Sequence, residues 1–231
     1  YWEEWFPADF ITECFPGQFR NWFYSLLAMS AFLENQAPFK TLLGHALVKD
    51  EKGDEMHKSA GNAIWFDDAA EKMGVDVMRW MYSKQNVENN LLFGYEKADE
   101  VRKKLISLWN IYSFFCTYAA LDKFIPGKNK INQNDLTLLD RWIKEKSKAL
   151  IVKSKTSFDK FEIDKFLKDI EIFIDELSNW YIRRNRRRFW KSENDKDKLI
   201  AYQTLYDVLL DLIKILSPVL PFVTERMFLN M

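Results

Sequence analysis

Apolar residues recur at helical spacing near the start of the chain and then give way to a short apolar run. Trp22, Phe23 and Leu26 share one face of an expected amphipathic helix over residues 18–35. Residues 41–48 are apolar and tolerate extended backbone, so we expect a strand there. A helix and a strand in close succession indicate that the first part of the chain is not purely helical.

A polar turn and two short helices are expected after this strand. Residues 50–54 contain three acidic side chains and a glycine, which are typical of a turn. Acidic residues at helix starts and a glycine at a helix end predict helices over residues 67–74 and 76–84. Strand, glycine-containing loop, helix and helix in this order are typical of the end of an α/β nucleotide-binding domain.

The remaining chain has an almost unbroken helical pattern. We expect helices over residues 96–120, 134–156, 163–190 and 197–216 and a short one after Pro221. Asn134 or Asp135 is the expected cap of the second of these helices. Short polar connections between long helices predict an antiparallel bundle. The expected fold is therefore mostly α, with a nucleotide-binding remnant over residues 1–93 and a helical bundle over residues 94–231.

Composition narrows the class of protein. The 231 residues are 48% hydrophobic and 16% aromatic, which excludes a disordered or collagen-like chain. Seven glycines and six prolines are too few for a turn-dense all-β fold. The 34 basic and 34 acidic side chains cancel, but their distribution is uneven. Residues 1–92 carry 8 basic and 14 acidic side chains, a net of −6, and residues 93–231 carry 26 and 20, a net of +6.

Cysteine usage and apolar segments indicate where the protein resides. Cys14 and Cys116 lie far apart and outside any Cys-x-x-Cys or Cys/His cluster, which predicts a reducing, cytoplasmic compartment and no metal site. Residues 105–121 form the most apolar stretch, but Asn110 interrupts it, so we expect a buried helix and no membrane contact. The expected protein is a monomer without a tightly bound cofactor.

A segment with one lysine and several small residues follows the acidic turn. Met56, His57, Lys58 and Ser59 precede an alanine and a Gly-Asn pair. A lysine ammonium is a mobile point charge, and small residues let the backbone approach a phosphate closely. The spacing is not that of a Walker A loop. A phosphate site is one interpretation, and a charged surface loop is the other.

Polar residues also gather where the first expected helix begins. Glu13, Gln18 and Arg20 lie close in sequence to Trp22. Polar groups at a helix N-terminus can recognise a small ligand. A helix start stabilised by a hydrophobic staple is the alternative interpretation of these residues.

Five arginines occupy six positions near the end of the third long helix, bracketed by aromatic residues. Such clustering is repulsive unless counter-charge is supplied, and phosphate is the usual supplier. Carboxylates on nearby turns, such as Glu171, Asp175 and Glu176, are the alternative supplier. Interleaved aromatics favour nucleic acid. The candidate RNA-binding residues are Asn179, Trp180, Arg183, Arg184, Arg186, Arg187 and Arg188.

These segments stand in the order found in one enzyme family. Residues 7–23 resemble the Pro-Ala-Asp … Glu-Gly-x-Asp-Gln-x-Arg-Gly-Trp-Phe segment of class I aminoacyl-tRNA synthetases. Residues 56–62 resemble that family's Lys-Met-Ser-Lys-Ser signature with its Gly-Asn tail, and residues 74–79 resemble the Gly-Ala-Asp-x-x-Arg that follows. Residues 177–183 and 201–225 are similar to the anticodon-binding helical domain. Within the isoleucine, valine and leucine subgroup, the resemblance is closest to the isoleucyl-tRNA synthetases.

The resemblance implies a ligase that joins isoleucine and ATP, with Mg²⁺, into an aminoacyl-adenylate and then transfers the aminoacyl group to tRNA. It implies that Lys58 is catalytic and neutralises charge on the departing pyrophosphate. The other implied contacts are Met56, His57 and Ser59 to ATP, Glu13 and Gln18 to the adenylate, Trp22 to the isoleucine side chain, and the arginine cluster to tRNA.

The chain also departs from the family pattern. Glu55 replaces the first Lys of the signature, His57 replaces its first Ser, and Gly17 replaces the Asp before Gln18. Because the loss of a lysine removes positive charge from the phosphate loop, we expect an altered rate of adenylation. The family's His-Ile-Gly-His motif is not in these 231 residues. We therefore expect a C-terminal piece of a synthetase that does not activate isoleucine alone. A valyl-tRNA synthetase piece and a non-catalytic RNA-binding module remain the alternatives.

Overall fold

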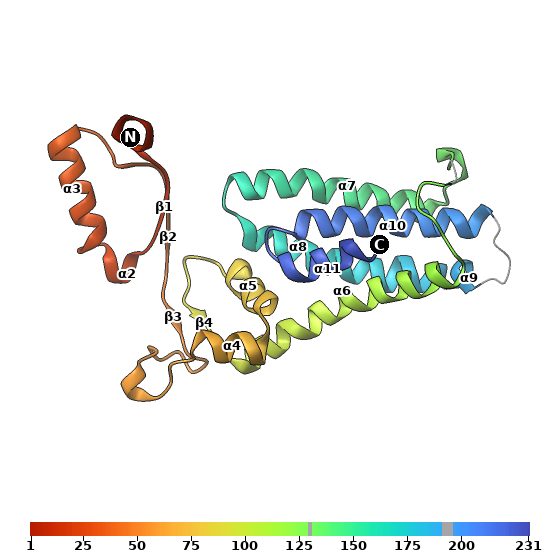
Figure 1. Ribbon diagram of the computed structural model, residues 1–231, viewed down its shortest axis with the longest axis horizontal. Helices are drawn as coiled ribbons and strands as arrows, with labels where there is room; N and C mark the ends of the chain where they lie inside the picture. The colour runs from red at the N-terminus through yellow and green to blue at the C-terminus, as the bar shows by residue number, and fades with distance from the viewer. Residues whose placement is uncertain (129–130, 191–195) are drawn as a thin grey trace. The chain divides into compact units, whose positions relative to one another are not determined.

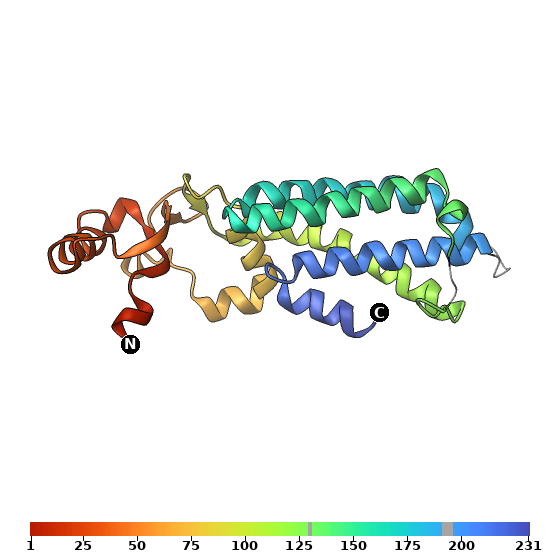
Figure 2. The same cartoon turned by 90° about the horizontal axis from the view of Figure 1, so that it is seen from above.

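The chain folds into two compact units. The computed structural model describes residues 1–128, 131–190 and 196–231 (Figures 1 and 2). One unit contains Tyr1–Phe66 and Gln85–Lys97, and the other contains Asp67–Lys84 and Ala98–Met231. The boundary expected after residue 93 assigns residues 67–84 to the nucleotide-binding part. Packing instead places these residues with the helical unit.

The first unit is built on two parallel strands. β1 (Ala8–Cys14) pairs with β2 (Phe39–His45) along its length. Parallel neighbours need a long crossover, and this one contains α2 (Phe15–Gln18) and α3 (Trp22–Glu34). The helix expected over residues 18–35 therefore begins later, at the start of α3. Gln18 instead ends the separate turn α2.

Two further short strands belong to the same unit. β3 (Val48–Lys49) and β4 (Leu91–Leu92) pair in parallel. The single strand expected over residues 41–48 is thus two strands, and the Ala46 N–H between them donates to the Val87 carbonyl at 2.8 Å. The short helix α1 (Trp2–Trp5) precedes β1. β1 itself was missed, because a short segment without regular alternation of buried and exposed positions gives little signal.

The second unit is an antiparallel helix bundle with two short helices ahead of it. Its helices are α4 (Phe66–Met73), α5 (Val75–Lys84), α6 (Tyr95–Leu121), α7 (Leu138–Asp159), α8 (Ile163–Asp175), the π-helical segment η3 (Glu176–Ile182), α9 (Arg183–Trp190), α10 (Lys196–Leu216) and α11 (Pro221–Leu229). Successive long helices reverse direction (Figures 1 and 2). α7 and α10, which are separated in the chain by α8 and α9, pack side by side. The prediction of a mostly helical bundle is confirmed.

Apolar side chains from four elements fill the core of the bundle. Trp80 of α5, Ile143 of α7, Phe166 of α8 and Leu205 of α10 have no exposed surface. Full burial of a large apolar side chain stabilises a fold by about 1.5–3 kcal/mol. The helical periodicity read from the sequence is therefore the periodicity of this core.

The start of α7 differs from the expected one. Thr137 caps it through a capping box, in which Thr137 Oγ1 accepts from the Asp140 N–H at 3.2 Å and Asp140 Oδ2 accepts from the Thr137 N–H at 2.9 Å. Asn134 and Asp135, the expected caps, lie in the 3₁₀ turn η2 (Gln133–Asp135) ahead of the helix. The prediction of the cap was wrong because Thr-x-x-Asp satisfies two backbone N–H groups at once.

α5 is fixed to the start of α11 and to the turn before it by two polar side chains. Asp76 Oδ2 accepts from the Val223 N–H at 2.7 Å, and burial raises the pKa of Asp76. Arg79 donates to the carbonyls of Val219 and Pro218 at 2.9 and 2.7 Å. This is the structural use of the Gly-x-Asp-x-x-Arg sequence: the Asp binds a backbone N–H in the first turn of α11, and the Arg binds carbonyls that follow α10.

The carboxylate of Asp140 is the most heavily used polar group in the bundle. It has no exposed surface and accepts from Arg188 at 2.8 and 3.0 Å and from the Tyr181 hydroxyl at 2.7 Å. Arg188 also forms an ion pair with Asp197 at 2.9 Å. These contacts join α7, η3, α9 and α10 at one point.

Removal of this carboxylate is expected to destabilise the helical unit strongly. Asp140→Ala leaves the Arg188 guanidinium buried with one counter-charge fewer, which costs about 3–5 kcal/mol of unfolding free energy. Asp159→Ala, which removes an exposed carboxylate from the same helix, is the matched control and is expected to change it by less than about 0.5 kcal/mol. Urea unfolding followed by far-ultraviolet circular dichroism measures both. Equal effects of the two substitutions would show that the Asp140 carboxylate is not a major source of stability.

The same carboxylate makes stability depend on pH. Burial raises the pKa of Asp140, but hydrogen bonds from Arg188, Tyr181 and Thr137 outweigh burial and hold that pKa below its usual value. A folded-state pKa below the unfolded value, about 3.9, gives stability that is present above that value and is lost as pH falls. The gap in unfolding free energy between the unmodified chain and Asp140→Asn is therefore expected to narrow from pH 5 towards pH 2. A constant gap would contradict this.

Candidate functional site

The phosphate-loop candidate, residues 55–62, is anchored by one asparagine side chain. Asn62 Nδ2 donates to Asp50 Oδ2 at 2.9 Å and to the Glu55 carbonyl at 3.0 Å, and Asn62 Oδ1 accepts from the His57 N–H at 2.9 Å. The bond from Asn62, followed by one from the Asp54 N–H, lowers the pKa of Asp50. The loop therefore has a fixed backbone around side chains that face solvent.

Lys58 begins the 3₁₀ turn η1 (Lys58–Ala60) inside this loop. The turn ends at Gly61 with a φ of 72°, a left-handed conformation that glycine adopts at low cost. Lys58 and Ser59 are exposed, and the ammonium of Lys58 lies 4.4 Å from the ring centroid of Trp65. A cationic side chain on a fixed, exposed turn is suited to binding phosphate.

The two unusual residues of the loop face each other. His57 Nε2 lies 3.4 Å from Glu55 Oε2, and both side chains are largely exposed. Met56 between them is half-buried. Glu55 thus has a basic neighbour within reach, so its negative charge, which the family signature lacks, is partly offset when His57 is protonated.

The adenylate candidates lie at the end of β1 and in α2. Glu13 Oε1 accepts from the Cys14 N–H at 2.8 Å, and Gln18 Oε1 accepts from the Trp22 N–H at 3.5 Å, at the first residue of α3. Both side chains are half-buried. Within the described part of the chain, no hydrogen bond or ion pair joins Glu13 or Gln18 to the phosphate loop.

An apolar groove lies beside these residues. It has a volume of about 410 Å³, and its wall includes Trp22, which is 43% exposed, with Trp2, Trp5, Leu26 and Met29. Almost all of its lining is apolar, so it is suited to an aliphatic or aromatic group and not to a charged one. Trp22, which the resemblance implies as a wall of the amino-acid pocket, is one of the residues that line this groove.

The arginine cluster forms a basic face on η3 and α9. Arg183, Arg184, Arg186 and Arg187 are exposed. Two of them stack on tryptophans: the guanidinium carbon of Arg184 lies 4.3 Å from the ring centroid of Trp180, and that of Arg186 lies 4.9 Å from the ring centroid of Trp190. Each tryptophan is about half exposed. We call these six residues the basic face.

Arg188 and Asn179 differ from the rest of the predicted cluster. Arg188 is buried, and its guanidinium is used by Asp140 and Asp197 inside the bundle. Grouping Arg188 with the RNA-binding arginines is therefore not supported, because its charge is neutralised within the fold. Asn179 is exposed, and it donates to Asp175 at 2.6 Å.

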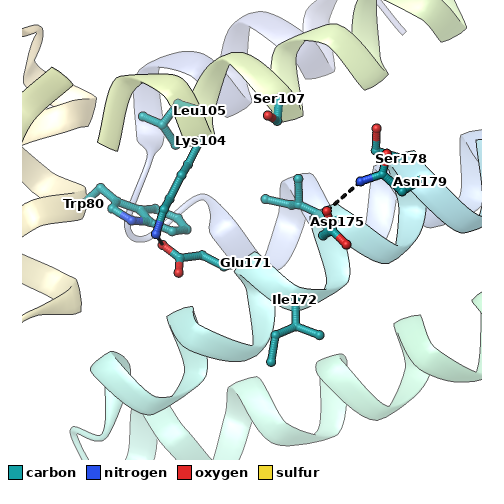
Figure 3. A pocket seen from close by; sticks show the side chains of 10 residues that line it. Trp80, Lys104, Leu105, Ser107, Glu171, Ile172, Asp175, Ser178 and Asn179 are labelled. Carbon is teal, nitrogen blue, oxygen red and sulfur yellow. Dashed lines mark hydrogen bonds and ion pairs between the residues drawn. The ribbon is translucent and has the colours of Figure 1, made fainter. Parts of the chain in front are cut away.

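Two hollows flank the π-helical segment. One, of about 270 Å³, is lined by Arg183 and Arg186 and opens next to the basic face. The other, of about 440 Å³, has Lys104 paired with Glu171 beside Trp80 (Figure 3). Asp175 also lines this second hollow, so the charged side chains of its lining are one lysine and two carboxylates and attract phosphate less than the arginines of the first.

No helix in residues 1–128, 131–190 or 196–231 is long and apolar enough to cross a membrane. In the same residues, no group of three or more His, Cys, Asp or Glu side chains is arranged to hold a metal ion.

Three residues in or beside the loop were not predicted to have a role. Asp50 and Asn62 fix its backbone, and Trp65 contacts its lysine. Asn62 belongs to the Gly-Asn tail that the sequence analysis noted, but a spacing rule does not say which atoms an amide binds. Trp65 gave no signal, because a single aromatic residue after a loop has no periodic partner.

Two protein families match the chain. Residues 2–93 match the family described as tRNA synthetases class I (I, L, M and V). Residues 140–230 match the anticodon-binding domain of tRNA ligase. The first match contains the phosphate loop and the apolar groove, and the second contains the basic face.

The relatives with similar sequences are isoleucine–tRNA ligases. The chain is 43% identical over 230 residues, 98% of its length, to the isoleucine–tRNA ligase of Dehalococcoides mccartyi strain ATCC BAA-2266. It is 40% identical over 235 residues, 99% of its length, to that of Clostridium novyi. The chain spans 22% of the length of each of these two relatives.

Solved synthetases share the fold at low sequence identity. A Mycobacterium tuberculosis methionyl-tRNA synthetase in complex with methionyl-adenylate matches with a TM-score of 0.78 and 20% identity, over 98% of this chain and 44% of that one. The LeuRS of Agrobacterium radiobacter K84, in its ternary complex, matches with a TM-score of 0.73 and 16% identity, over 97% and 27%. Since the fold, both family matches and the related sequences agree, the chain belongs to the class I aminoacyl-tRNA synthetases.

Proposed function

We propose that the chain is part of a cytoplasmic isoleucine–tRNA ligase and supplies the loop that binds ATP phosphates and a surface that binds tRNA. The observation that carries this proposal is the 43% identity to an isoleucine–tRNA ligase over 98% of the chain. The whole ligase would condense isoleucine with ATP and then transfer the aminoacyl group to the tRNA.

The phosphate loop supports the first half of the proposal. Adenylation is catalysed mostly by positioning and by charge stabilisation at the phosphates. Lys58 supplies an exposed positive charge on a backbone held by Asn62. Charge also develops on the departing pyrophosphate, and a lysine on a fixed loop stabilises it without reorganisation. Mg²⁺ would accompany ATP as part of the substrate.

The apolar groove supports an aliphatic amino acid as the substrate. Trp22 forms one wall of a surface with almost no polar lining. Burial of an aliphatic side chain there is favourable, but one methylene changes binding by only about 1–3 kcal/mol. The groove is therefore consistent with isoleucine, and discrimination against valine requires contacts beyond those in this chain.

The basic face supports RNA as the partner. Guanidinium groups bind phosphates bidentately, and exposed aromatic rings stack on unpaired bases. Trp180 and Trp190 carry arginines against their rings, so a charge and a stacking surface occur together twice. Residues 93–231, which contain this face, carry a net charge of +6, opposite in sign to the charge of tRNA.

The role of Lys58 is testable in a chimera. This chain replaces the matching segment of the D. mccartyi ligase, and isoleucine-dependent ATP–pyrophosphate exchange is measured. The chimera is expected to be active, and Lys58→Ala is expected to lower its kcat by about 10²–10³ because a charge-stabilising donor is lost. Lys52→Ala in the nearby exposed turn is the matched control and is expected to leave kcat unchanged. An equal loss in both variants, or exchange with valine alone, would contradict the proposal. The chain by itself is expected to be inactive.

RNA binding by the basic face has a salt signature. In the isolated chain, Arg183→Ala with Arg187→Ala is expected to weaken tRNA binding and to lower the slope of log K against log salt by about 2, one unit for each phosphate contact. The control is Lys148→Ala with Lys165→Ala, since these lysines are already paired with carboxylates. Fluorescence anisotropy between 50 and 200 mM salt measures both. Identical slopes for the two pairs would show that the basic face is structural.

A further inference from the structure

The ammonium of Lys58 rests on an aromatic face and not on a carboxylate. Its Nζ lies 4.4 Å from the ring centroid of Trp65, within the range of a cation–π contact. Glu55 lies three residues before Lys58 in the same loop. Even so, Lys58 forms no ion pair among the residues that the structure describes. The lysine thus has a neutral partner although acidic side chains are close in sequence.

The loop backbone produces this contact. Lys58 starts the turn η1, and Gly61 reverses the chain in a left-handed conformation with a φ of 72°. Asn62 then fixes the far side of the turn to Glu55 and His57. Trp65 follows this fixed point by three residues and is 56% exposed, so its ring lies at the surface beside the loop.

The identity of the partner determines what the lysine can do next. An ion pair with a carboxylate would have to be broken before Lys58 bound a phosphate. An indole ring restricts the long side chain but leaves the positive charge and the N–H donors available. A restricted side chain loses less conformational freedom when it binds than a free one does.

We propose that Trp65 is a positioning residue for Lys58, holding its ammonium on the indole face so that it is ready to bind the phosphates of the nucleotide. This inference rests on the proposed phosphate role of the loop. It adds a residue to the site that neither the sequence pattern nor the family matches assign. Trp65 acts only through Lys58 and has no contact with the reacting atoms in this account.

The contact itself has a spectroscopic signature. Protons above an aromatic ring shift upfield in nuclear magnetic resonance spectra, so the Lys58 Hε resonances of the isolated chain are expected upfield of those of other lysines. Trp65→Leu is expected to remove this shift, and Trp65→Phe is expected to retain part of it because a ring remains. Lys58 resonances at the usual lysine position in the unmodified chain would overturn the inference.

The effect on binding is measured with inorganic pyrophosphate as the probe. Titration followed by the same resonances is expected to give a Kd raised roughly two- to five-fold by Trp65→Leu, the range of an exposed cation–π contact. Trp65→Phe is expected to restore most of this loss. Tyr24→Leu, which changes an exposed aromatic residue of the same unit outside the apolar groove, is the matched control and is expected to have no effect.

A double-mutant cycle separates positioning from a structural role. With Lys58→Ala already present, Trp65→Leu is expected to change the pyrophosphate Kd no further. An equal effect with and without Lys58 would overturn the inference and leave the proposed function standing. If the unmodified chain does not bind pyrophosphate at millimolar concentrations, the phosphate role of the loop fails, and the inference fails with it.

Discussion

The buried ion pair between Asp140 and Arg188 determines what the helical unit shows to solvent. Asp140 has no exposed surface, and two nitrogens of one guanidinium bind its two oxygens. Because Arg188 is fixed inward, the rotation of α9 about its axis is fixed as well. The arginines at positions 183, 184, 186 and 187 must then face outward. One inward arginine therefore orients the four outward ones.

In the phosphate loop, too, one side chain fixes the backbone: Asn62 binds it and leaves Lys58 exposed. The helices α4 and α5 follow the loop in the chain and belong to the helical unit. Asp76 binds a backbone N–H at the start of α11, and Arg79 binds carbonyls of the turn before it. The segment after the loop thus packs within the unit that carries the basic face.

Much of the helical unit was predictable from the sequence, and the reason is periodicity. The long helices over residues 96–120, 163–190 and 197–216 bury one face each, so their apolar positions recur with the helical repeat. The ends of elements were less predictable: Thr137 displaced the expected caps of α7, and the strand β1 was missed. Helix ends and short strands depend on partners distant in sequence, which local spacing does not encode.

The candidate site was also only partly predictable from the sequence. Arg188 turns inward because it pairs with Asp140, which lies on another helix. Local spacing does not encode this pairing, so the sequence predicted Arg188 to bind RNA together with its neighbours. The resemblance to the synthetases located Lys58 and Trp22 through motifs. It did not locate Trp65, because a contact between a lysine and a ring across a turn follows from backbone geometry and not from a motif.

Arginine-specific modification with phenylglyoxal, read by mass spectrometry with and without tRNA, tests the central claim most directly. We expect rapid reaction in the free chain, and protection by tRNA, for Arg183, Arg184, Arg186 and Arg187. Arg188 is predicted to react slowly in both states, because its guanidinium is buried against Asp140. Rapid reaction of Arg188, or no protection of the other four by tRNA, would contradict the account.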